Sequence, residues 1–202
     1  MLTTKHQAMR LVLGEATAKA AIESFEVTRR SINDLPEYFL SVSIARYVQQ
    51  YYKTFTFSME DSVSSICKEL DLDEGFVERP GKVDIVVRSQ QRGFAKHIIE
   101  LKRGYGEKGH VADIERLADF CMLSPSGHSL STNYMVMVSA ATPYVSKKRE
   151  AFLLDYINDL YHGNIALKRE PVKLCSSLKS TRQGKTKGKP LTGEIWQVSY
   201  CG

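Results

Sequence analysis

The chain has 202 residues, 43% of them apolar, and carries 28 Lys and Arg against 23 Asp and Glu, a net charge of +5. A chain of this length and apolar content can bury one substantial core, and its charge suits a polyanionic partner. No stretch approaches the ~18 apolar residues of a membrane span, and residues 1–5 lack the features of a secretion signal, so we expect a cytoplasmic protein without membrane contact.

The first third of the chain is predicted to be helical. Residues 7–25 carry apolar side chains at helical intervals. A second helix is expected to follow, with Asn33 or Asp34 as its N-terminal cap and Pro36 tolerated in its first turn. It is expected to end near Tyr52.

A strand and a short helix are predicted next. Residues 54–59 alternate polar and apolar side chains, as a half-buried strand does. Residues 61–72 have the pattern of a short amphipathic helix. The acidic stretch at 71–75 has too few oxygen ligands for a calcium loop, so we interpret it as solvated surface.

The most informative segment is an expected β-hairpin. Residues 83–87 form a β-branched strand that contains Asp84, and residues 94–102 resume as a second strand after a turn. Two strands joined in this way pair antiparallel. Because side chains alternate across a strand, Glu100 and Lys102 share one face. The sequence leaves open which residue lies opposite Asp84.

Two acids and a lysine in this arrangement suit metal-dependent cleavage of a phosphodiester. Mg²⁺ takes one or two carboxylates, keeps several waters and accepts phosphate oxygens. Lys102 can supply positive charge where negative charge develops, or lose its proton and act as a base. The alternatives are an edge-strand charge or an arginine-paired buried acid for Asp84, and a solvated strand end for Glu100 and Lys102.

Beyond the hairpin, the pattern predicts a helix at residues 110–123, a buried strand at 134–138, a helix at 148–161 and a strand at 194–200. Residues 179–190 contain five positive charges and no acid, and predict a mobile basic loop between two strands. Such segments attract backbone phosphates without reading sequence, although a solubilising loop has the same composition.

Several enzyme classes are not supported by motifs. The four cysteines form no Cys-x-x-Cys pair and the five histidines show no metal-ligand spacing, which argues against a zinc site. The sequence has no Gly-x-Ser-x-Gly elbow, no phosphate-cradling glycine-rich loop and no dinucleotide fingerprint. These absences weaken the interpretations as a triad hydrolase, a nucleotide hydrolase or a dehydrogenase.

The spacing Asp84-x15-Glu100-x-Lys102 on a hairpin resembles the motif of the PD-(D/E)XK nuclease superfamily, whose fold is restriction-endonuclease-like. The resemblance implies an α/β fold with an αβββαβ core and a mixed central sheet flanked by helices, here with an added N-terminal helix. It also implies that Asp84 and Glu100 bind a metal and that Lys102 assists catalysis. The chain departs from the motif's first pair by having Val83 in place of proline.

Leading helices supply an additional acid to the site in that family. Glu37 is our first candidate for this extra metal ligand, and its alternative role is a first-turn acid that favours the helix dipole. Glu60, expected at the end of the strand at 54–59, is the rival candidate.

The expected protein is therefore a single nuclease-like domain over residues 1–202, with a helical part at 1–53, a catalytic core at 54–165 and C-terminal strands at 166–202. We expect it to hydrolyse phosphodiester bonds in DNA with Mg²⁺ or Mn²⁺, in defence, mobile-element biology or repair. Duplex cleavage implies a homodimer, a partner protein or repeated nicking. One alternative is a catalytically silent nucleic-acid-binding or protein-interaction module on the same fold. The other is a non-nuclease α/β structural protein, which would have no affinity for nucleic acid at moderate salt.

Basic residues near the motif and in the C-terminal loop are the expected contacts to nucleic acid, although a solvated helix face is the alternative for those on the helix at 110–123. They are Arg103, Lys108, Arg116, Arg182, Lys185, Lys187 and Lys189.

Overall fold

The structure is a computed structural model that describes residues 5–72, 81–104, 107–124, 130–175, 179–180 and 189–201. The helices are α1 (Lys5–Thr28), η1, a short 3-10 helix (Ile32–Asp34), α2 (Glu37–Tyr51), α3 (Val63–Leu70), α4 (Glu107–Leu123) and α5 (Pro143–Tyr161). The strands are β1 (Phe55–Ser62), β2 (Lys82–Ser89), β3 (Ala95–Arg103), β4 (Thr132–Ser139), β5 (Ile165–Val172), β6 (Lys179–Ser180), β7 (Lys189–Pro190) and β8 (Thr192–Tyr200).

Six strands form one mixed sheet in the order β1-β2-β3-β4-β8-β5, and β6 and β7 form a separate two-stranded ribbon. β3 and β4 are parallel and are connected through α4, whereas the other neighbouring strands of the large sheet are antiparallel. A crossover of this kind is required because parallel neighbours cannot be joined by a tight turn. The expected α/β class with a mixed central sheet is confirmed.

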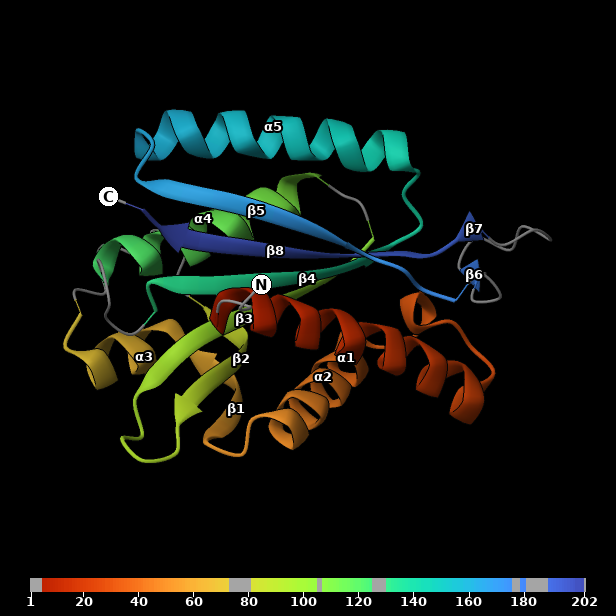
Figure 1. Ribbon diagram of the computed structural model, residues 1–202, viewed down its shortest axis with the longest axis horizontal. Helices are drawn as coiled ribbons and strands as arrows, with labels where there is room; N and C mark the ends of the chain where they lie inside the picture. The colour runs from red at the N-terminus through yellow and green to blue at the C-terminus, as the bar shows by residue number, and fades with distance from the viewer. Residues whose placement is uncertain are drawn as a thin grey trace.

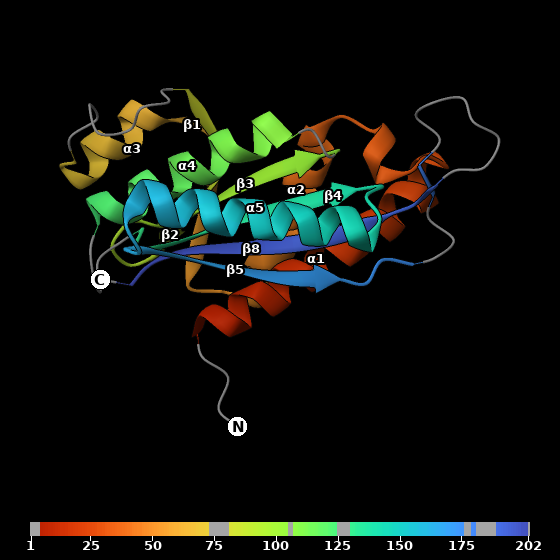
Figure 2. The same ribbon diagram turned by 90° about the horizontal axis from the view of Figure 1, so that it is seen from above.

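Helices cover both faces of the sheet (Figures 1 and 2). α1 and α2 pack on one face, where Leu13, Leu40 and Ile44 join a core with alternate residues of β2, β3 and β4. α3, α4 and α5 cover the other face and build a second core that includes the large buried side chain of Trp196. Three layers of this kind bury both sides of the central strands, which explains their near-continuous apolar runs.

The hairpin of β2 and β3 sets the positions of the motif residues. Ile85 pairs with Ile99, and continuing this antiparallel register by one residue sets Asp84 opposite Glu100. A bulge between Val87 and Arg88 shifts the register only on the turn side of these pairs. β2 lies between β1 and β3, so the interpretation of Asp84 as an edge-strand charge is wrong.

The predicted cap of the second helix is also wrong. Asn33 and Asp34 belong to η1, which is capped by the Ser31 hydroxyl accepting from the Asn33 N–H at 3.3 Å. Pro36 takes the position before the first turn of α2, in an extended conformation with φ −56° and ψ 145°. Because proline has a fixed φ and no N–H, it fits this position without leaving a donor unsatisfied.

Other boundaries differ from the expected ones by a few residues. β1 continues through Ser62, so α3 begins later than the helix predicted at 61–72. α5 begins at Pro143, because the Thr142 hydroxyl accepts from the Val145 N–H at 3.4 Å and proline suits the first helical turn. The ribbon of β6 and β7 brackets residues 181–188 of the predicted basic loop, which lie outside the described residues. No helix within the described ranges combines the length and apolar character needed to cross a membrane.

Candidate active site

Asp84 and Glu100 face each other across the hairpin, on the side of the sheet that α4 covers. Asp84 Oδ2 accepts a hydrogen bond from the Leu101 N–H at 2.6 Å. The carboxyl groups of Asp84 and Glu100 lie within hydrogen-bonding reach of each other. Two carboxylates so close repel, so a shared proton or a cation beside them would stabilise the pair.

Burial changes the acidity of both groups. Loss of solvent raises the pKa of Glu100 well above its usual value, and the neighbouring Asp84 and Asp113 raise it further, while Arg116 acts against them. Burial also raises the pKa of Asp84, although the Leu101 N–H and Lys102 oppose the rise. Without an added cation, both carboxyl groups therefore hold protons more strongly than free side chains do.

Two residues of α4 complete the polar cluster. Arg116 donates to Glu100 Oε1 through Nε at 2.9 Å and contacts the same oxygen through Nη2 at 2.7 Å. The same Nη2 lies 3.0 Å from Asp113 Oδ1, and Asp113 Oδ2 lies 2.8 Å from the Nζ of Lys102. Glu100 and Lys102 on β3 thus contact Asp113 and Arg116 on one face of α4. The side chain of Glu100 is only 2% exposed, so its interpretation as part of a solvated strand end is wrong.

Lys102 is the accessible member of this cluster, with 28% of its side chain exposed. Burial lowers the pKa of its ammonium, but contact with Asp113 and the charges of Glu37 and Asp84 outweigh that effect and raise the pKa above its usual value. Lys102 is consequently a cation at neutral pH.

Glu37, at the start of α2, lies close enough to the motif to interact electrostatically with it. Burial raises the pKa of Glu37, Lys102 lowers it and Asp84 raises it. Its Oε2 lies 3.7 Å from the Nε of Arg103. The pairing of β1 with β2 skips Glu60, whose side chain is exposed and whose backbone φ is +59°. The described contacts therefore link Glu37, and not Glu60, to the motif.

Asp84 and Glu100 suit a hard divalent cation that takes only a few of its ligands from the protein. Within the described residues, no group of three or more His, Cys, Asp or Glu is arranged to hold a metal. Asp113 and one oxygen of Glu100 are instead engaged by Arg116 and Lys102. The close pair of Asp84 and Glu100 nevertheless supplies the one or two carboxylates with which Mg²⁺ is usually held, the remaining positions being filled by water and phosphate.

The expected nucleic-acid contacts fall into two groups. Arg116 is bound to Glu100 and Asp113, and Arg103 donates to the carbonyl oxygens of Asn33, at 3.3 Å, and Leu35. Both guanidinium groups therefore stabilise the surroundings of the site, and contact with phosphate would require them to exchange partners. The side chains of Lys108, Arg182, Lys185, Lys187 and Lys189 lie outside the described residues.

Asp113 and His110 were not among the predicted site residues. His110 is buried near Lys102, and burial together with the charges of Arg149 and Lys102 lowers its pKa to about 4. The sequence signal for Asp113 is its position three residues before Arg116 on a helix that follows the motif strand, where i and i+3 side chains share a face.

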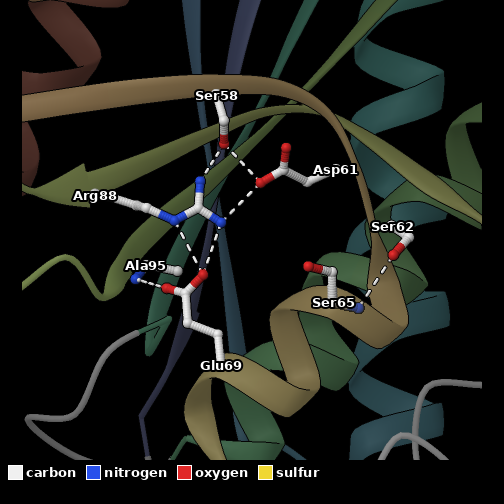
Figure 3. Close-up of polar contacts among 7 residues, drawn as sticks. All are labelled: Ser58, Asp61, Ser62, Ser65, Glu69, Arg88 and Ala95. Atoms are coloured by element: carbon white, nitrogen blue, oxygen red, sulfur yellow. Dashed lines mark hydrogen bonds and ion pairs between the residues drawn. The ribbon is translucent and has the colours of Figure 1, made fainter.

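A second charged cluster, shown in Figure 3, gathers two carboxylates around one arginine. The guanidinium of Arg88 contacts Asp61 Oδ2 at 2.7 Å and Glu69 Oε2 at 2.8 Å, and it also donates to Ser58. Glu69 accepts in addition from the Ala95 N–H at 2.7 Å. Both carboxylates share Arg88 as their cationic partner, so the cluster fastens α3 to β1, β2 and β3.

Comparison with known proteins gave no similarity from which a function can be transferred. No family model matches the chain. No curated protein and no solved structure matches it either.

Proposed function

We propose that this protein is a metal-dependent nuclease that hydrolyses phosphodiester bonds in DNA. The observation that carries the proposal is the pair of Asp84, which is partly buried, and Glu100, which is buried, two mutually repelling carboxyl groups with the ammonium of Lys102 on the same strand face. A divalent cation, Mg²⁺ or Mn²⁺, would be held by Asp84 and Glu100, and Glu37 is close enough to interact electrostatically with Asp84. When bound, it would acidify a water molecule and polarise a phosphate oxygen.

The chain's own residues have separate roles in this proposal. Lys102 acts as a fixed positive charge and not as a proton acceptor, because Asp113 holds its ammonium in the charged form. The Leu101 N–H fixes one oxygen of Asp84 and leaves the other oxygen for a ligand. Arg103 helps to hold the carboxylate of Glu37 in place through their ion pair.

The order of elements supports a restriction-endonuclease-like fold. α2, β1, β2, β3, α4 and β4 follow one another as an αβββαβ core, with α3 inserted between β1 and β2. The antiparallel hairpin is followed by a parallel β4 next to β3, and α1 is the added N-terminal helix. Asp84 lies on the second strand of this core and Glu100 on the third.

Cleavage assays test the proposal directly. Supercoiled, linear and single-stranded DNA are incubated with Mg²⁺ or Mn²⁺ and the wild type, Asp84→Ala, Lys102→Ala or the exposed control Asp159→Asn on α5. We expect Asp84→Ala and Lys102→Ala to lose on the order of 100-fold or more in rate, since each removes a charge that acts on the reacting phosphate. The control should cleave as the wild type does.

A catalytically silent binding module on the same fold gives a different result. DNA would then remain intact under every metal condition while binding is retained without metal, and Lys102→Ala would bind as the wild type does. That result would replace the nuclease proposal. Loss of both cleavage and binding at moderate salt would exclude both functions.

A further inference from the structure

We propose that Asp113 is a positioning residue for Lys102, holding its ammonium over the carboxylate pair while ligating no metal itself. The inference rests on the proposed function and adds a residue on α4 to a site otherwise built from β2, β3 and α2. It is carried by the ion pair between Lys102 Nζ and Asp113 Oδ2 at 2.8 Å and by the near-complete burial of the Asp113 side chain, which is 7% exposed.

The geometry pairs both oxygens of Asp113 with cations. Its Oδ1 contacts Arg116 at 3.0 Å while its Oδ2 contacts Lys102. Arg116 in turn contacts Glu100. A carboxylate held between an ammonium and a guanidinium has its charge balanced, so a divalent cation gains less from it than from Asp84 and Glu100, whose charges repel.

Lys102 needs such a partner because of its length and exposure. A lysine side chain is flexible and loses much rotamer freedom when its ammonium is fixed at one point. A buried acid on a helix that packs against the strand fixes that point before substrate arrives. Reactions of this kind lose rate when a charged group is misplaced by even about 1 Å, so positioning by Asp113 affects the rate of the chemical step.

Arg116 gives the arrangement its stiffness. Glu100 and Lys102 are two residues apart on β3, and Asp113 and Arg116 are three residues apart on α4, so their contacts join helix and strand at two points. Asp113 can therefore keep Lys102 in place even when Glu100 binds a cation and its contact with Arg116 loosens.

The test compares Asp113→Asn and Asp113→Ala with the control Glu115→Gln. Glu115 is a buried acid on the same helix, and its carboxylate accepts a hydrogen bond from the Tyr156 hydroxyl instead of pairing with Lys102. For both Asp113 variants we expect kcat on DNA to fall by roughly 10- to 100-fold with KM almost unchanged, because positioning acts on the chemical step. In a Lys102→Met background, Asp113→Asn should cost less than about twofold, because a residue that acts through Lys102 has nothing left to position.

Two measurements do not depend on nuclease activity. The Lys102 amine should react several-fold faster with an amine-modifying reagent in Asp113→Asn than in the wild type or Glu115→Gln, as followed by mass spectrometry of its peptide. Calorimetric titration with Mn²⁺ should give an affinity within about twofold of the wild type for Asp113→Asn.

Each contrary result overturns the inference in a recognisable way. Loss of Mn²⁺ affinity by tenfold or more would make Asp113 a metal ligand, and unchanged Lys102 reactivity would show that it does not hold the ammonium. Equal rate losses in the presence and absence of the Lys102 side chain would indicate a purely structural role. If the wild type cleaves no DNA, the proposed function fails, while the amine-modification experiment still decides whether Asp113 positions Lys102.

Discussion

Replacing Asp84 by Asn should make the metal-free protein more stable while removing its activity. Asn keeps an oxygen that can accept from the Leu101 N–H, and it removes the negative charge beside Glu100. Two unit charges about 4 Å apart interact by about 4 kcal/mol at the effective dielectric of a protein site. The lost attraction of Asp84 to Lys102 offsets part of this, so we expect a net gain of about 1 to 2 kcal/mol at pH 8.

The pH dependence of this stability gain shows whether it comes from the charge of Asp84. The pKa of Asp84 is raised in the folded protein from its usual 3.8, so the unfolded chain loses this proton at a lower pH than the folded chain does. Stability of the wild type is therefore lost as pH rises through the folded pKa, and the advantage of Asp84→Asn should shrink towards pH 4.5. For a chain of this size, 1 kcal/mol corresponds to about 2 to 4 °C in Tm.

Urea unfolding in the presence of a chelator, at pH 8 and pH 4.5, measures this effect. Mn²⁺ added at pH 8 should stabilise the wild type and leave Asp84→Asn almost unchanged, because only the wild type offers both carboxylates. Asp61→Asn is the matched control with the opposite sign, since the carboxylate of Asp61 is paired with Arg88. A gain that is the same at both pH values, or a loss of stability at pH 8, would refute the reasoning.

Two further predictions concern other buried charges. Glu69→Gln should destabilise the protein by about 1 to 3 kcal/mol in urea unfolding, because it weakens the contacts of Glu69 to Arg88 and to the Ala95 N–H. A change below about 0.5 kcal/mol would contradict the role of this cluster in holding α3 on the sheet. The His110 ring should titrate in NMR near pH 4 and not near 6.5. Because the unfolded chain binds this proton first, stability should fall as pH drops from 6.5 to 4, by about 3 kcal/mol, and a His110→Phe variant should lack that slope.

The hairpin could be predicted from sequence because its signals are local. Alternation alone sets Glu100 and Lys102 on one strand face, and β-branched residues around Asp84 identify the partner strand. The register was left open because it depends on the turn and the bulge at Val87 and Arg88, which the residues 89–93 do not specify by composition.

The contribution of α4 could not be predicted, because it depends on how the helix lies on the sheet. The pattern of residues 110–123 indicated a helix and its apolar face, but the same pattern allowed Arg116 to point to solvent or to phosphate. Only the packed structure shows Arg116 on Glu100 and Asp113 on Lys102. The choice between Glu37 and Glu60 likewise depends on the positive φ and the exposure of Glu60, which the sequence pattern does not predict.

The bulge between Val87 and Arg88 separates the tip of the hairpin from the carboxylate pair of Asp84 and Glu100. Beyond it, the tip is closed by hydrogen bonds between Ser89 and Phe94 and between Gly93 and Ser89. We expect a change in the length of this tip to be absorbed at the irregular pairing, without a shift of Asp84 relative to Glu100. Residues 90–93 should therefore tolerate insertions while the geometry of the carboxylate pair is kept.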